Sequence, residues 1–138
     1  MPYDILDHPA DAKFRATGET KEEAFSEAVE AFSEIVGGDS GMYTHSVEVK
    51  SEGLDPLLFD FLDELIFLQD TENVVVSHAS ELKMEELEDG WKLSAEIMVD
   101  DITPEVHKLD VKGPTYSEME VEYDEERSAW VTQAVIDI

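Results

Sequence analysis

The chain has 138 residues, a length that fits one domain around a single hydrophobic core. Its 35 acidic and 9 basic residues give a formal charge of −26, which argues against direct binding to a nucleic-acid backbone because like charges repel. The 42% hydrophobic content falls in periodic segments, so the charge indicates an acidic shell around a folded core rather than disorder. Such a shell is typical of a protein adapted to a salty cytoplasm, where salt screens self-repulsion.

Other broad classes are excluded by residue usage. The chain has no cysteine, so disulfides, thiolate metal sites and cysteine nucleophiles are ruled out. The opening residues, Met1 to Asp4, lack the basic and apolar regions of a signal peptide, and no apolar run approaches the roughly 20 residues that span a bilayer. We therefore expect a soluble, cytoplasmic protein with no membrane segment.

The first part of the chain predicts two short strands and a helix. Strands are expected at 3–8 and 12–17, and the second alternates apolar with polar residues. Thr20 and Glu23 form a capping box, after which apolar residues recur at helical spacing. Gly37-Gly38 ends this helix.

The middle of the chain predicts a half-buried strand at 43–50 and then a second helix. Asp55-Pro56 supplies an N-cap and a first-turn proline, and the residues from Leu57 to Leu68 are apolar around most of the helix. This pattern is typical of a central core helix. Three carboxylates share one narrow face of this helix at i, i+3, i+4 spacing: Asp60, Asp63 and Glu64. They form either a solvated stripe, which is the simpler interpretation, or a functional cluster.

The remainder predicts strands joined by short connections. A strand begins at Asn73–Ser77, and others are expected at 91–99, 116–124 and 129–138. The chain turns at Glu88-Asp89-Gly90, and Asp100 to Lys108 is expected to be a loop. The last strand is apolar on both faces and should lie inside a sheet. We predict an α+β fold, a single two-layer domain over 1–138 whose largely antiparallel or mixed sheet carries two main helices.

The two ends of the chain carry a candidate site. The segment from Leu6 to Asp11 is rich in carboxylates, and Asp137 ends one face of the last strand. A buried carboxylate there needs a partner, which a metal ion would provide, with the free carboxylate of Ile138 beside it. Hard oxygen donors suit Ca²⁺ or Mg²⁺. The alternative is an exposed terminus that frays.

These features resemble the archease family, whose members begin with Leu-Asp-His-x-Ala-Asp and end on a hydrophobic strand closing in Asp-Ile or Asp-Val. The resemblance extends over the whole chain, through the blocks 57–68, 70–72 and 110–116. It differs at Pro9, where threonine is common, and at Ser117, where many relatives have histidine, so no imidazole role can be assigned there.

The resemblance implies which residues form the site. It assigns metal binding, commonly of Ca²⁺ with Mg²⁺ as an alternative, to Asp11, Asp137 and Ile138. Asp7 and His8 belong to the same motif, and they are expected either to support the metal ligands without binding the ion or to have a structural role. Lys112 matches a lysine that matters for function in the family, as a contact to an acidic partner or a nucleotide phosphate. The residues alone would also allow a solvated strand lysine.

The resemblance also implies the function. Archeases are non-enzymatic activators of the RtcB-type RNA ligase in tRNA splicing, and they promote ligase guanylylation and multiple turnover. An alternative is chaperone-like modulation of an RNA methyltransferase or another basic RNA-processing protein. A metal-dependent hydrolase is the weakest hypothesis, because the chain has no zinc-binding His-Glu-x-x-His, nucleophile elbow or glycine-rich phosphate loop.

Overall fold

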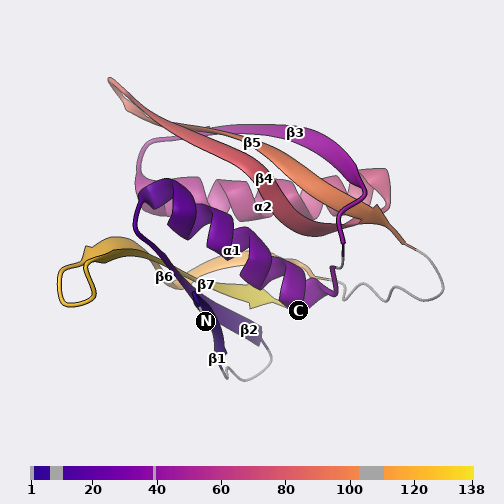
Figure 1. The fold of residues 1–138 in the computed structure, drawn as a ribbon, viewed down its shortest axis with the longest axis horizontal. Coiled ribbons are helices and arrows are strands. Elements are labelled where there is room, and N and C mark those ends of the chain that lie inside the picture. The colour runs from indigo at the N-terminus through magenta and orange to yellow at the C-terminus, as the bar shows by residue number, and fades with distance from the viewer. Residues whose placement is uncertain (1, 7–10, 39, 103–110) are drawn as a thin grey trace.

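Two helices lie between two antiparallel sheets in the computed structural model, which describes residues 2–6, 11–38, 40–102 and 111–138 (Figure 1). The four-stranded sheet has the order β1-β2-β7-β6 and the three-stranded sheet the order β3-β5-β4. In chain order the elements are β1 (Tyr3–Leu6), β2 (Asp11–Gly18), α1 (Lys21–Val36), β3 (Tyr43–Ser51), α2 (Leu54–Glu72), β4 (Val74–Leu87), β5 (Gly90–Asp101), β6 (Gly113–Asp124) and β7 (Ala129–Asp137).

The predicted α+β class, the two helices and the antiparallel pairing are confirmed. The layers number three rather than two, because α1 packs against both β2 and β4 while α2 packs against both β6 and β3. The helices touch each other through Phe25 and Phe61, whose ring centroids are 6.4 Å apart. Strand alternation shows which face is buried but not which strands share a sheet, so a second sheet leaves no local signal.

Helix α1 begins and ends as predicted. The backbone N–H of Glu23 donates to Thr20 Oγ1 at 3.1 Å, and the Glu23 carboxylate accepts from the backbone N–H of Glu19 at 3.0 Å. At the other end, Gly37 has φ 96° and its N–H donates to the Ser33 carbonyl at 2.8 Å. The left-handed conformation of Gly37 needs no Cβ, which explains the glycine at this position.

Helix α2 starts earlier than predicted, and Asp55 is not its N-cap. Gly53 holds that position, and the Asp55 carboxylate instead accepts a 2.9 Å bond from the backbone N–H of Val121 in β6. Asp55 is the second residue of the helix, so it lies beyond the N-cap position. The helix runs on to Glu72 and ends at Asn73, which takes the left-handed conformation at φ 55°.

The predicted hairpin between β4 and β5 is confirmed, whereas the predicted loop begins too early. Asp100 and Asp101 belong to β5, and buried Asp100 accepts a 2.8 Å bond from the backbone N–H of Gly41. The later part of that loop, 103–110, lies outside the described residues. Among the helices that the structure describes, none is both long and apolar enough to cross a membrane.

Candidate metal and partner site

Strand β7 lies at the centre of its sheet and brings the two ends of the chain together. Asp137 pairs with Asp11 of β2 on one side and with Gly113 of β6 on the other. The backbone N–H of Lys112 donates to the Asp137 carbonyl at 2.8 Å. The expected meeting of the chain ends is therefore observed, and Lys112 lies at the same end of the sheet.

The side chains of Asp11 and Asp137 share the face of the sheet that points away from the helices. Ala134 and Ile136 of β7 are fully buried in the core, so Asp137, of the opposite parity, lies on the other face. Directly paired residues of antiparallel strands project to the same side, which places Asp11 beside it. Both residues are half-buried.

This pair of carboxylates fits a hard cation. Paired side chains have Cβ atoms about 4.5–5.5 Å apart, and like charges at that separation destabilise a sheet. A bound cation would remove this repulsion with oxygen donors that Ca²⁺ and Mg²⁺ prefer. Ile138 follows directly and is 39% exposed.

Two carboxylates alone do not complete a metal site. Within the described ranges, no three side chains of His, Cys, Asp or Glu form a group that could hold an ion. Further donors must then come from elsewhere, as the proposed carboxylate of Ile138 would. Asp7 and His8 lie outside the described residues.

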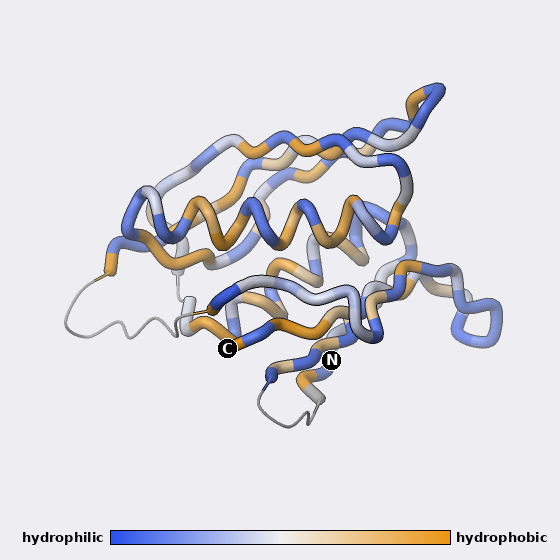
Figure 2. Tube along the Cα trace, turned by 180° about the vertical axis from the view of Figure 1, so that it is seen from behind, coloured by the Kyte–Doolittle hydropathy of each residue, from blue (hydrophilic) through white to orange (hydrophobic). Residues whose placement is uncertain are grey.

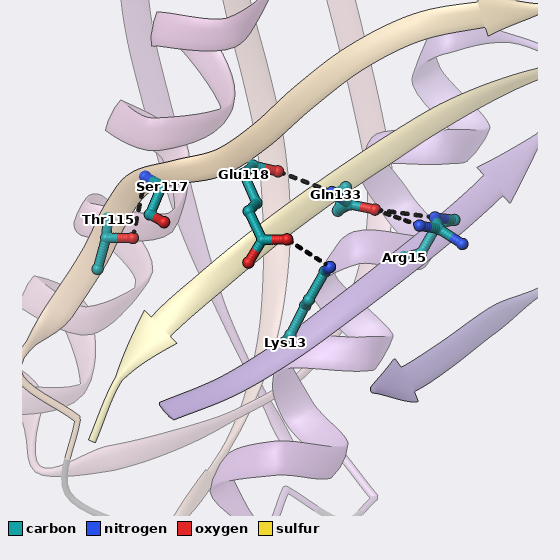
Figure 3. A network of polar contacts seen from close by, with 6 residues as sticks. All are labelled: Lys13, Arg15, Thr115, Ser117, Glu118 and Gln133. Atoms are coloured by element: carbon teal, nitrogen blue, oxygen red, sulfur yellow. Dashed lines mark hydrogen bonds and ion pairs between the residues drawn. The ribbon is translucent and has the colours of Figure 1, made fainter. Parts of the chain in front are cut away.

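A polar network next to this pair covers the same outer face (Figure 3). Arg15 donates to Gln133 Oε1 from two nitrogens at 2.9 and 2.6 Å, and Gln133 Nε2 donates to the Glu118 carbonyl at 2.8 Å. Lys13 Nζ forms a 2.9 Å ion pair with the Glu118 carboxylate. The network therefore joins β2, β7 and β6, and sequence reasoning missed it. The available signal was the scarcity of basic residues, since two of only nine fall on one face of β2.

Strand β6 bulges where Glu118 receives these bonds. Thr115 lies opposite Val135 and Glu120 opposite Gln133, so five steps along β6 match two along β7. Glu118 has φ 59°, a conformation that costs a non-glycine residue about 1–3 kcal/mol. Such bulges redirect side chains.

The residues from Lys112 to Ser117 divide between the end of the sheet and the bulge. Lys112 is exposed one residue before the strand, as both the partner contact and the alternative of a solvated lysine require. Ser117 lies in the bulge, and its backbone N–H donates to Thr115 Oγ1 at 3.2 Å. Tyr116 stacks on Phe59 of α2 with ring centroids 4.2 Å apart and planes at 3°.

The three predicted carboxylates of α2 do not act as one cluster. Asp60 accepts a hydrogen bond from the Ser51 hydroxyl of β3, Asp63 is exposed, and Glu64 is half-buried. The solvated interpretation holds for Asp63, whereas Asp60 joins the helix to its neighbouring strand.

Clear pKa shifts fall on two carboxylates and a phenol, none of them Asp11 or Asp137. Burial and then the nearby Glu30 raise the pKa of Glu27 on α1. A hydrogen bond with Glu122 and then burial raise the pKa of Glu120 on β6. Burial followed by a hydrogen bond to Glu34 raises the pKa of Tyr3 to about 12. All three shifts favour the neutral form in an excess of negative charge.

Comparison with known proteins identifies relatives along the whole chain. Residues 3–138 match the model of the Archease protein family (MTH1598/TM1083). The chain is 34% identical to protein archease of Pyrococcus abyssi, covering 99% of this chain and 98% of that protein. It is 33% identical to protein archease of Methanopyrus kandleri, with both chains fully covered.

Solved structures agree with this result. The solution structure of Methanobacterium thermoautotrophicum protein 1598 superimposes with a TM-score of 0.83 at 30% identity, covering 99% of each chain. A crystal structure from Thermotoga maritima, described as an archease and possible chaperone, gives a TM-score of 0.62 at 18% identity, with 96% of this chain and 94% of that chain covered. The second likeness concerns the fold alone.

Proposed function

Because this chain belongs to the archease family, we propose that it is a non-enzymatic, metal-binding activator of an RtcB-type RNA ligase in tRNA splicing. In this role it promotes guanylylation of the ligase and its multiple turnover. The observation that carries the proposal is the meeting of Asp11, Asp137 and Lys112 at one end of β7.

The proposed metal ligands are Asp11, Asp137 and Ile138, with Ca²⁺ as the expected ion and Mg²⁺ as the alternative. The ion would supply positive charge between the opposed carboxylates and so order the chain ends. Asp7 and His8 belong to the same motif and are proposed to support the ligands. Lys112 is exposed beside these carboxylates, where its ammonium can contact an acidic group of the partner or a nucleotide phosphate.

Charge supports a protein partner rather than RNA itself. A formal charge of −26 repels phosphate, while it attracts a basic RNA-binding enzyme and speeds their encounter. The relatives are named as archease proteins and not as enzymes, which supports a non-enzymatic role. A metal-dependent hydrolase would need a base or nucleophile beside the ion, and the sequence contains no recognised motif for either.

A second candidate is chaperone-like modulation of an RNA methyltransferase or another basic RNA-processing protein. The Thermotoga maritima protein, whose fold this chain shares, is described as a possible chaperone. Purification of the native protein with its partners separates the two proposals, because ligase peptides should dominate in one case and methyltransferase peptides in the other.

The direct test combines the purified chain with the RtcB-type ligase of the same organism, GTP and a divalent metal. We expect faster guanylylation and repeated turnover with the wild type, and loss of both in Asp11→Asn and Lys112→Met. Asp89→Asn in the β4–β5 hairpin removes an equal charge from an exposed site and should remain active. Unchanged guanylylation and turnover on addition of the wild type would refute ligase activation.

The role of Ile138 has its own test. A short peptide extension after Ile138 removes its terminal carboxylate without changing a side chain. We expect the affinity for Ca²⁺ to fall about tenfold, because hard-cation affinity depends on the number of anionic oxygen donors. Calorimetric titration of the extended and unextended proteins measures this, and equal affinities would remove Ile138 from the ligand set.

A further inference from the structure

Helix α2 exposes an aromatic and acidic surface between the two sheets. Its members Phe59, Asp63 and Phe67 follow at i, i+4 and i+8 on one helix face, and Tyr116 of β6 completes it. Phe67 is 60% exposed and Tyr116 57% exposed. Seen from behind, α2 lies in front with hydrophobic and hydrophilic stretches alternating along it (Figure 2). We call these four residues the aromatic-acidic surface.

The position of Tyr116 on this surface is fixed by the bulge in β6. Tyr116 follows Thr115, where the regular register with β7 is interrupted, and its ring lies flat on Phe59. The bulge is held from the opposite face by the bonds of Lys13 and Gln133 to Glu118. The strained residue of this bulge is Glu118, two residues beyond Tyr116, and bulges of this kind redirect the side chains beside them.

The charge of this surface selects its occupant. Asp63 lies one helical turn from both Phe59 and Phe67, with Glu64 next to it. Among the described residues, no lysine or arginine forms an ion pair with Asp63 or Glu64. A second copy of this chain would bring carboxylate against carboxylate, and RNA would bring phosphate, so both are disfavoured.

The matching chemistry is a guanidinium group. Arginine stacks its plane on aromatic faces and donates paired hydrogen bonds to a carboxylate, whereas lysine offers a point charge. Exposed phenyl and phenol rings around an exposed carboxylate provide both interactions.

We propose that the aromatic-acidic surface docks an arginine-bearing segment of a basic protein partner. The surface adjoins the metal end of the sheet, because Tyr116 is three residues beyond Gly113, the partner of Asp137, or about 10 Å along a strand. The carboxylates lie on the outer face of this sheet and Tyr116 lies on its helix side, so a partner that contacts both must reach around the β6 edge. This inference rests on the proposed function only for the choice of the ligase as a test protein.

The first test uses an arginine-rich peptide and a lysine peptide of equal length and charge, titrated into the full chain while amide and aromatic NMR signals are followed. We expect the arginine peptide to bind more tightly, with shifts concentrated on Phe59, Asp63, Phe67 and Tyr116. Tyr116→Ala and Asp63→Asn should each weaken its binding about fivefold, as loss of a stacked or ionic contact implies.

Matched variants separate this surface from general charge attraction. Asp89→Asn removes the same charge elsewhere, and Met42→Ala shortens a side chain that is 73% exposed, as a control for Phe67→Ala. Both controls should bind the arginine peptide like the wild type. Equal losses in Asp63→Asn and Asp89→Asn, or shifts spread over the whole acidic surface, would overturn the proposal.

The second test measures binding of the RtcB-type ligase to the same variants. We expect Tyr116→Ala and Phe67→Ala to weaken ligase binding about fivefold while keeping wild-type affinity for Ca²⁺. Full ligase binding by both variants would overturn the proposal for this partner. If the wild type itself fails to bind the ligase, the proposed function fails, and the peptide titration still decides whether the surface selects arginine.

Discussion

The two ends of strand β7 differ in how their charged groups are matched. At its start, the Lys21 ammonium lies 4.7 Å from the ring centroid of Trp130 and 5.3 Å from that of Trp91, and Tyr123 meets Trp130 edge-on. Trp91 belongs to the other sheet, so this cluster joins both sheets to the beginning of α1. The cation has its partners within the chain.

At its other end, β7 sets two carboxylates against each other. Asp11 and Asp137 are paired directly, so the sheet ends in a like-charge contact that costs stability. At the start of β7 the cation lies against aromatic rings of the same chain, whereas at its end two carboxylates lie on opposed strands, where a bound cation would lower their repulsion.

The largest expected effect is metal-dependent stability that arises at the carboxylate end. Calcium at a hundred times its dissociation constant should raise the free energy of unfolding by about 2.7 kcal/mol. Asp137→Asn should lose about half of this gain, because removal of one charged ligand weakens binding about tenfold, while Asp89→Asn should keep it. Urea unfolding of the three proteins with and without calcium measures the difference.

Asp137→Asn should have the opposite effect on stability when no metal is present. Asp137→Asn then removes a like-charge contact, so its free energy of unfolding should exceed that of the wild type by about 0.2–1 kcal/mol. If calcium stabilised Asp137→Asn as much as the wild type, the ion would bind elsewhere and the contrast between the two ends would be lost.

The second prediction concerns the aromatic end. Trp130→Ala should lower the free energy of unfolding by about 2 kcal/mol, less than for a fully buried ring because Trp130 is half-buried. Its affinity for calcium should not change, because Trp130 lies at the opposite end of β7. Thermal or urea unfolding and a calcium titration test both statements, and a shared loss of affinity would mean that the two ends are coupled.

A smaller effect is expected from the cation itself. Lys21→Met keeps most of the side-chain length but removes the charge, and should cost about 0.5–1 kcal/mol. Lys83→Met serves as its control, because Lys83 is exposed and its ion pair is with the nearby exposed Glu81. Similar stabilities of the two variants would show that the tryptophans pack against the stem of Lys21 and not against its charge.

Sequence patterns predicted the structural features that depend on neighbouring residues. The capping box, the hairpin and the apolar β7 were predicted because neighbouring residues determine them. The meeting of Asp11 with Asp137 followed from a carboxylate at the end of a central strand, with support from the family resemblance.

Contacts between distant residues left no such signal. The Asp55 carboxylate accepts a bond from Val121, 66 residues away, while the helix begins at Leu54 and leaves Asp55 beyond the N-cap position. The bulge in β6 has no glycine at its left-handed position, which is occupied by Glu118. The bonds from Lys13 and Gln133 hold Glu118 in this strained conformation. In the sequence, Lys21 is an ordinary residue of the first helical turn. Its contacts with Trp91 and Trp130 arise only when the two sheets pack around α1.

The smallest expected effect separates the metal pair from another acidic cluster, on α1. Burial and the neighbouring Glu30 raise the folded-state pKa of Glu27 above its ordinary value of 4.5, so its ionised form costs stability near neutral pH. Lowering the pH through the raised folded-state pKa toward 4.5 should therefore return that stability in the wild type.

Glu27→Gln has no carboxylate to titrate, so its free energy of unfolding should rise less than that of the wild type between pH 7 and pH 4.5. Urea unfolding across this range measures the difference. A proton relieves this cluster, whereas a cation relieves the pair at the end of β7, so calcium at pH 7 should stabilise Glu27→Gln and the wild type equally. A smaller calcium effect in Glu27→Gln would place the ion on α1 and reverse the assignment of the two acidic regions.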